Sequence, residues 1–365
     1  MSGAGGERAE ALRQIRDSAA AVATPADLSR VRGLRFGPAG YDRAVVGRMG
    51  ALGWIGLRVP EDKGGAGLGL GELAALAEEL GRGLVPEPLV PIAAIALPLL
   101  GEAGRAGAFA DGAQIVLPAL AERANRFDPS DIGTVAEANR LTGQKRFIAG
   151  GAGADLFIVS ARAASQTGIW LVQADGKGVT RRVDETVDGG GFATLTLDDA
   201  PAEPLLEDAR IALARALDEA AIATAAELLG VMDRALGLTL DYLRTREQFG
   251  RRIGSFQALQ HRAADLAIQV ALTRATLEAA ITTVEAGAQG ARRAAAASQA
   301  KARASEAALL VTRGAIQLHG GIGYTDEADI GLFLKRAMVL AASFGNAQLH
   351  RRRYASSAPP VEAET

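Results

Sequence analysis

The sequence contains no cysteine and only three histidines, His261, His319 and His350. The absence of cysteine excludes disulfides, thiolate metal sites and cysteine nucleophiles. The histidines are scattered along the chain, which argues against a histidine metal site. A formal net charge of -2 and 48% hydrophobic residues exclude a disordered, collagen-like or strongly nucleic-acid-binding class.

Long apolar runs are also missing. The longest, residues 89–100, is interrupted by proline and is too short to span a bilayer. The first residues lack the apolar core of a signal peptide. These features predict a cytoplasmic protein with no membrane span and no nucleic-acid partner.

Proline is absent from a large part of the chain. None of the 13 prolines lies between Pro204 and Pro359, and this stretch is rich in Ala, Leu, Arg and Glu. Because proline breaks helix interiors, the stretch predicts a bundle of long helices. Apolar positions from Ile222 to Leu240 recur at spacings of three and four, as in an amphipathic helix. Further helices are expected at about 255–287, 292–318 and 327–344.

The central part has a different pattern. Short β-branched or aromatic runs at 147–148, 156–159, 169–172 and 192–197 alternate with Gly, Asp and Asn, which predicts an antiparallel sheet. The first 110 residues are again helical in pattern, most clearly at 73–84. The expected fold is mainly α. It has an N-terminal helical domain (1–110), a central β-domain (111–206), a C-terminal four-helix bundle (207–356) and a tail (357–365).

Residues 242–257, YLRTREQFGRRIGSFQ, are the most informative segment of the chain. They end one predicted helix, turn at Gly250 and Gly254, and start another helix with Ser255 as the expected N-cap. Arg246 lies at a helix C-terminus, where a cation suits the helix dipole.

A second segment, residues 317–325 (QLHGGIGYT), has three glycines in four positions. Such glycines end a helix and allow a ligand to approach the backbone closely. Taken alone, the segment fits an ordinary glycine-rich turn. Two further segments, residues 53–82 and 143–159, have sequence patterns that are less distinctive than the first two. No glycine cluster satisfies the G-x-G-x-x-G spacing of a dinucleotide-binding fold.

In this order, the four segments resemble signatures of the acyl-CoA dehydrogenase family. The resemblance implies FAD as cofactor, an acyl-CoA substrate in fatty acid or sterol side-chain degradation, and an electron-transfer flavoprotein-like acceptor. It also implies a homo- or hetero-oligomer, because two motifs reach the FAD of a partner subunit. The cofactor-binding positions implied in this way are Arg246, Gln248, Phe249, Phe256, Gln257, Gln317, Gly320 and Gly321. A guanidinium suits a pyrophosphate because it offers paired donors.

The chain departs from the family pattern where the reaction needs a base. The usual glutamate position corresponds to Phe344, and an alternative position corresponds to Ala220. The adjacent Glu219 is rotated by about 100° on a helix, so a solvated surface position is expected for it. No catalytic residue is therefore assigned.

The expected flavin pocket also departs from the pattern. Phe147 and Ala149 replace a tryptophan and a threonine, although Phe147 could still stack on a flavin. Residues 123–131 do not reproduce the family's loop over the flavin. The basic run 351–353 is expected at a solvated helix end.

Three functions remain open. The chain could be a self-sufficient homo-oligomer with an unconventional base. It could be a non-catalytic partner that completes the FAD site of a paralogue, resembling the subunits without a catalytic base in heteromeric acyl-CoA dehydrogenases. It could also be a helical scaffold without cofactor.

Overall fold

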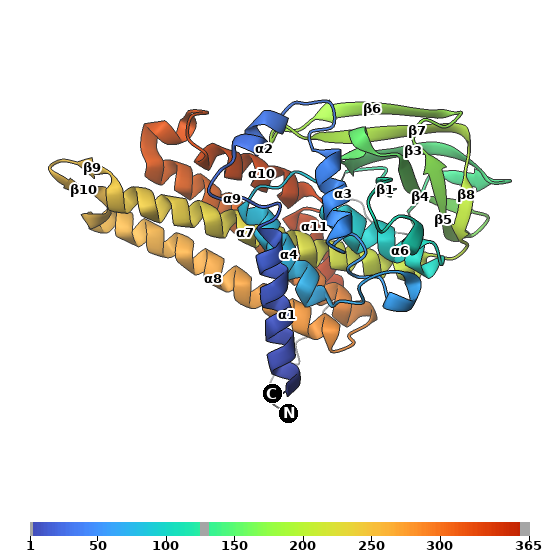
Figure 1. Cartoon of the computed structure of the whole chain (residues 1–365), viewed down its shortest axis with the longest axis horizontal. Helices are drawn as coiled ribbons and strands as arrows, with labels where there is room; N and C mark the ends of the chain where they lie inside the picture. The colour runs from blue at the N-terminus through green and yellow to red at the C-terminus, as the bar shows by residue number, and fades with distance from the viewer. Residues whose placement is uncertain (1–2, 125–130, 358–365) are drawn as a thin grey trace.

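A computed structural model describes residues 3–124 and 131–357 of the chain (Figure 1). Helices come first, a β-sheet follows, and long helices complete the chain. The expected fold class, mainly α with a central sheet, is confirmed. Within the described ranges, no helix combines the length and hydropathy required to cross a bilayer.

The N-terminal region consists of helices that pack against one another and against the first long helix of the C-terminal region. Its helices are α1 (Gly3–Ala19), α2 (Ser29–Leu34), α3 (Arg43–Ala51), α4 (Leu70–Arg82), α5 (Leu89–Pro91) and α6 (Leu97–Glu102). Five residues of π-helix, Ile92–Ala96, join α5 to α6. All but one of the residues from 88 to 101 are buried, so the longest apolar run forms part of the core.

The central region is one sheet of eight strands with the order β6-β7-β3-β2-β4-β5-β8, and β1 pairs with β4. The strands are β1 (Val116–Ala119), β2 (Val135–Glu137), β3 (Arg140–Ala149), β4 (Leu156–Ala163), β5 (Gln166–Gln173), β6 (Val179–Glu185), β7 (Gly191–Pro201) and β8 (Glu203–Leu206). The expected antiparallel pairing holds for the predicted strands, β3 with β7 and β4 with β5. The sheet as a whole is mixed, because β4 also pairs in parallel with β1 and β2. The other pairs are antiparallel.

The C-terminal region contains the four helices that the proline-free stretch predicts, α7 (Arg210–Thr245), α8 (Gln257–Glu285), α9 (Gly290–His319) and α10 (Ile330–Ala342). A further helix, α11 (Ala347–Ser357), lies beyond the predicted ranges. A two-stranded hairpin, β9 (Glu247–Gln248) and β10 (Arg251–Arg252), joins α7 to α8 and projects beyond the end of the helices (Figure 1).

Two local predictions in this region were wrong. Phe256, not Ser255, is the N-cap of α8, and the Ser255 hydroxyl donates backwards to the Arg252 carbonyl oxygen at 2.7 Å. The basic run on α11 is only partly solvated, because the Arg353 guanidinium donates to the buried Asp218 at 2.5 Å.

Two glycines allow α4 and α7 to cross in direct backbone contact. A Cβ atom at Gly81 would overlap the Glu227 carbonyl oxygen, and one at Gly230 would overlap the Glu78 carbonyl oxygen. Both helices need a residue without a side chain at the crossing, so the N-terminal region is packed tightly on the bundle.

A buried cluster of charges lies where the three regions meet. The Arg336 guanidinium of α10 donates to Glu227 of α7 at 2.6 Å and to Asp188, between β6 and β7, at 3.2 Å. It also donates to the Val85 carbonyl oxygen, after α4, at 3.3 Å. The Arg336 side chain is 17% exposed and the Glu227 side chain 8% exposed, so water screens the pair poorly.

We expect Glu227→Ala to lower the free energy of unfolding by about 3 kcal/mol, because it leaves a buried guanidinium without its main countercharge. Urea denaturation followed by far-UV circular dichroism measures this loss. Glu247→Ala, at an exposed position on β9, is the matched control. Equal stability of the two variants would contradict the importance of the buried pair.

The β-sheet contains a second buried ion pair. Lys145 of β3 is fully buried, and its ammonium donates to Glu122 at 2.7 Å and to the Ser160 hydroxyl at 3.2 Å. Glu122 also accepts from the Thr134 backbone and hydroxyl. Burial would raise the pKa of Glu122, but Lys145 and Thr134 lower it to about 2.

A folded-state pKa below the ordinary value stabilises the protein above the ordinary pKa, and this stability is lost as the carboxylate is protonated. The stability advantage of the native protein over Glu122→Gln should therefore shrink as the pH falls from 4.5 to about 2. Thermal unfolding across this pH range tests it, with Glu137→Gln on β2 as control. A difference that does not change with pH would count against the ionised pair.

Candidate functional site

Three positions that the sequence singles out line one cavity between the sheet and the helices. Phe147 and Ala149 reach it from β3, and Phe344 reaches it from the turn between α10 and α11. Its other lining residues are Pro91, Pro118, Ala124, Phe192, Ala342 and Ser343. The space is about 710 Å³, a figure that includes a part open to solvent.

Phe147 presents an aromatic surface to this cavity. Its backbone has a left-handed φ of 59°, and its side chain is 39% exposed. The ring meets the edge of Phe192 at a centroid distance of 6.4 Å, and the Arg146 guanidinium lies 5.2 Å from its centroid. A planar ligand ring could stack in this environment.

Among its described lining residues, the cavity has no Asp or Glu that could abstract a proton. A neighbouring cavity shares Pro91, Phe192 and Phe344 with it and is lined by three carboxylates. Each of the three is ion-paired: Glu87 with Arg30 at 2.8 Å, and Asp188 and Glu227 with Arg336. Sequence reasoning did not identify these buried charges, although each one interrupts an otherwise apolar or glycine-rich stretch.

The expectation of a solvated Glu219 was wrong. Its side chain is 13% exposed and accepts from Arg58 at 2.8 Å and from Arg293 at 2.7 Å. Burial would raise the pKa of Glu219, but the two arginines lower it below the usual range. The neighbouring Ala220 is completely buried. Glu219 is therefore held as a structural countercharge and is a poor proton acceptor.

The hairpin of β9 and β10, with Arg246 before it and Phe256 at its base, forms an exposed arm. Arg246 ends α7, donates its backbone N–H to the Tyr242 carbonyl oxygen at 2.9 Å, and accepts from the Ile253 N–H at 2.9 Å. Its side chain, like that of Gln248, is exposed. No ion pair to Arg246, Arg251 or Arg252 occurs within the described residues.

Aromatic contacts order the base of the arm. Phe249 at the tip has a φ of 55° and is 92% exposed. Its ring lies edge-on to Phe256 at 6.2 Å, and the Arg251 guanidinium lies 4.1 Å from the Phe256 centroid. Gln257 is exposed at the start of α8. The arm therefore presents aromatic and cationic groups to solvent in a defined conformation.

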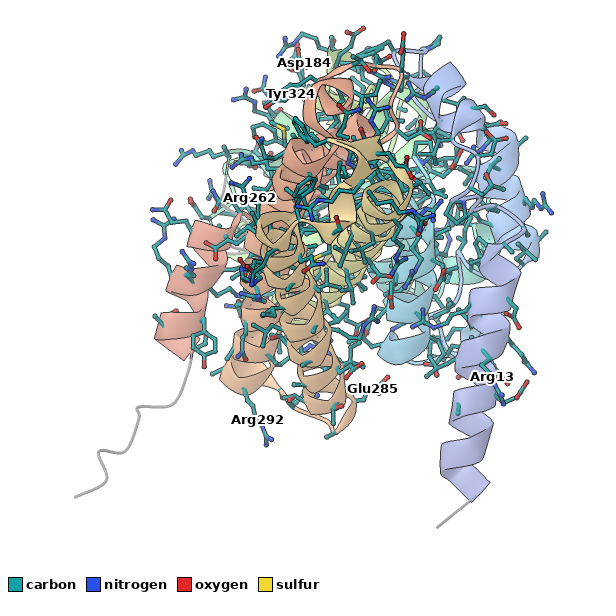
Figure 2. The ribbon with its side chains drawn as sticks, turned by 90° about the vertical axis from the view of Figure 1, so that its left-hand side faces the viewer. Arg13, Asp184, Arg262, Glu285, Arg292 and Tyr324 are labelled. Carbon is teal, nitrogen blue, oxygen red and sulfur yellow. The ribbon has the colours of Figure 1, made fainter. Side chains whose placement is uncertain are left out.

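The second glycine segment lies beside the base of this arm. The Tyr242 ring of α7 stacks on His319 of α9, with centroids 4.5 Å apart and an interplanar angle of 20°. Gln317, Gly320 and Gly321 are exposed there. A Cβ atom added at either glycine would contact nothing within 4 Å beyond its chain neighbours. Figure 2 shows the neighbouring Tyr324 at one end of the helical region. The two motifs, distant in sequence, thus share one end of the molecule.

The structure divides the predicted site residues between two places. The arm and the glycine segment are exposed at the end of the bundle, whereas Phe147 lies in the inner cavity. Of residues 123–131, whose sequence departs from the family pattern, residues 125–130 lie outside the described residues.

Two family descriptions match parts of the chain. Residues 9–106 match the family description "Acyl-CoA dehydrogenase, N-terminal domain". Residues 209–358 match "Acyl-CoA dehydrogenase, C-terminal domain".

Similar proteins cover almost the whole chain. Acyl-CoA dehydrogenase IpdE2 of Mycolicibacterium smegmatis is 35% identical, over 95% of this chain and 97% of the relative. The solved Tcur3481–Tcur3483 steroid ACAD has a TM-score of 0.84 and 34% identity, covering 96% of this chain and 97% of the matched chain. The ChsE4–ChsE5 complex from Mycobacterium tuberculosis has a TM-score of 0.86 and 26% identity, covering 97% and 98%. The chain belongs to the acyl-CoA dehydrogenase family, which consists of oxidoreductases.

Proposed function

We propose that this chain is one subunit of a heteromeric acyl-CoA dehydrogenase and completes the FAD site of a paralogous subunit. One contrast supports this proposal. The arm around Arg246 keeps its cationic and aromatic groups, whereas the cavity that Phe344 shares with Phe147 has no carboxylate among its described lining residues.

The exposed end of the bundle fits the diphosphate and adenosine parts of FAD. Arg246 would bind the pyrophosphate through paired donors. Gln248 and Phe249 would lie beside it, with Phe256 and Gln257 at the base of the arm. Gln317, Gly320 and Gly321 would face the adenosine, because the open space at both glycines allows close approach.

In the reaction of this family, an acyl thioester loses a proton from Cα and a hydride from Cβ, and bound FAD supplies the hydride acceptor. Phenylalanine cannot accept the proton. Phe344 would instead form an apolar wall and keep water from the cavity. The base would come from the paralogous subunit, and this chain would contribute cofactor contacts across the interface.

The names of relatives support the assembly and the substrate class. Two similar structures carry paired names, Tcur3481–Tcur3483 and ChsE4–ChsE5, and one of these is named a steroid ACAD. We therefore favour an acyl-CoA from sterol side-chain degradation over a simple fatty acyl-CoA, and an electron-transfer flavoprotein-like acceptor. We also retain the domain boundaries near residues 110 and 206 as part of the proposal.

Arg246→Ala should weaken FAD retention in the assembled complex without unfolding this chain. Loss of a charge-assisted hydrogen bond costs about 2 kcal/mol, or about thirtyfold in affinity. Flavin absorbance per complex after gel filtration, followed by FAD titration of the stripped complex, measures the change. Arg292→Ala is the matched control, because Arg292 lies at the opposite end of the helical region from Tyr324 (Figure 2). If both variants retain FAD equally, Arg246 does not bind it.

The purified chain alone should oxidise acyl-CoA poorly even when FAD is added. General-base catalysis contributes about 10²–10⁴-fold, and Phe344 and Ala220 supply none. Dye-coupled oxidation of a panel of straight-chain and sterol-derived acyl-CoAs should show activity only after co-expression with a paralogue that carries the missing glutamate. Rapid turnover by the lone chain would disprove the partner-subunit proposal and favour a self-sufficient homo-oligomer.

A further inference from the structure

A buried lysine whose described hydrogen-bond acceptors are all neutral lies beneath the turn that carries Phe344. Lys301, in the middle of α9, is completely buried. Its ammonium donates to the carbonyl oxygens of Leu340 at 3.1 Å, Ala341 at 3.2 Å and Gly345 at 3.0 Å, and to the Ser305 hydroxyl at 3.0 Å. Burial lowers the pKa of Lys301 to about 7. A buried lysine is costly, so these four neutral acceptors must offset much of the lost hydration.

The acceptors show which part of the chain Lys301 holds. Leu340 and Ala341 belong to the last turn of α10, where carbonyl groups lack the usual acceptor role for an N–H four residues on. The Leu340 oxygen also accepts from the capping Ser343 N–H at 3.2 Å. A cation there also faces the negative end of the helix dipole. Gly345 lies beyond the helix, in the turn that leads to α11. One ammonium therefore joins the end of α10 to the turn that follows it.

His350 of α11 holds the same turn from another direction. It is 2% exposed, and its Nε2 lies 2.9 Å from the Phe344 carbonyl oxygen, while Nδ1 lies 3.3 Å from the Ser298 hydroxyl. Burial and the neighbouring Lys301 lower the pKa of His350 to about 3, so the ring is neutral at pH 7. Since a carbonyl only accepts, Nε2 carries the proton that is donated to Phe344.

These contacts stabilise an unfavourable backbone conformation. Phe344 has a φ of 53°, in the left-handed region, and Gly345 has a φ of 101°. A bulky residue enters this region only when its surroundings impose it. The conformation places Phe344 in the wall shared by both cavities.

We propose that Lys301, assisted by His350, is a positioning residue that fixes the 343–345 turn so that the side chain at position 344 faces the cavity. This part of the proposal needs no cofactor or partner. A second part goes beyond the proposed function, because it needs FAD and a thioester at this chain's own cavity: the same support would present a carboxylate correctly in a Phe344→Glu variant. The introduced carboxylate would then take the Cα proton of the thioester, the Cβ hydride would reduce FAD, and the dye would reoxidise the flavin.

Hydrogen exchange followed by mass spectrometry tests the first part on the full chain. We expect Lys301→Met to accelerate exchange in peptides covering 340–346 by about tenfold or more, with little change in the β-sheet or in α7. Lys335→Met, which removes a partly exposed lysine from α10, should leave these peptides unchanged. Unchanged exchange in Lys301→Met, or equal acceleration throughout the chain, would overturn the positioning role. If Lys301→Met does not fold, His350→Leu, which removes the bond to Phe344, must show the same local acceleration.

Dye-coupled activity of the FAD-loaded complex tests the second part. To isolate this site, the paralogue carries a substitution of its own catalytic glutamate. Phe344→Glu should then raise kcat by about 10²-fold or more. Adding Lys301→Met should lower this kcat with little change in KM, because the carboxylate is misplaced while the binding surfaces remain. A kcat in Phe344→Glu that does not depend on Lys301 would overturn the positioning role. If Phe344→Glu stays inactive while Lys301→Met accelerates exchange locally, the positioning role stands and the placement of the thioester and flavin at this cavity is wrong.

Discussion

One buried guanidinium joins the three regions of this fold. Arg336 belongs to α10 and donates to α7, to the turn between β6 and β7, and to the backbone after α4. Burying these charges costs hydration, but removing one partner costs more, because the remaining charge is left unpaired. The inner cavities are lined by residues of all three regions. Their shape therefore depends on this contact and on the close crossing of α4 with α7.

The same constraint explains why the carboxylates near the inner cavities are not free to act as a base. The charges of the second cavity hold elements together: Glu227 and Asp188 neutralise Arg336, and Glu87 accepts from Arg30. Outside both inner cavities, Glu219 is held by Arg58 and Arg293. A carboxylate whose oxygens are held by an arginine is not free to reach a substrate proton and makes a poor general base. Lys301 and His350 nevertheless hold the turn at residue 344. Under the proposed function, phenylalanine would occupy the position of the base on this turn.

Sequence reasoning predicted helices and strands correctly where one property, such as the absence of proline or a run of apolar residues, dominated a segment. The proline-free stretch predicted the long helices, and apolar β-branched runs predicted the cores of β3, β4, β5 and β7. It missed β6, because that edge strand is almost entirely exposed and carries charged residues. It also missed the burial of Glu219, since Arg58 and Arg293 are far away in sequence and the helical pattern alone does not reveal them. The resemblance located Phe147, Ala149 and Phe344, but only tertiary structure brought them to one cavity.

The exposed arm has features that favour burial against a partner. Phe249 leaves 92% of its surface in water and holds a left-handed backbone conformation. Both features are unfavourable for an isolated chain, because a large apolar ring gains free energy only when it is buried. The aromatic contact with Phe256 keeps the arm ordered before it meets any ligand. Ordering in advance reduces the entropy lost on binding, so the unfavourable exposure of Phe249 is offset only in an assembly that covers it. An arm of this kind, in a chain whose Phe147 cavity lacks a carboxylate among its described lining residues, accords with the proposal that the chain completes another subunit's site.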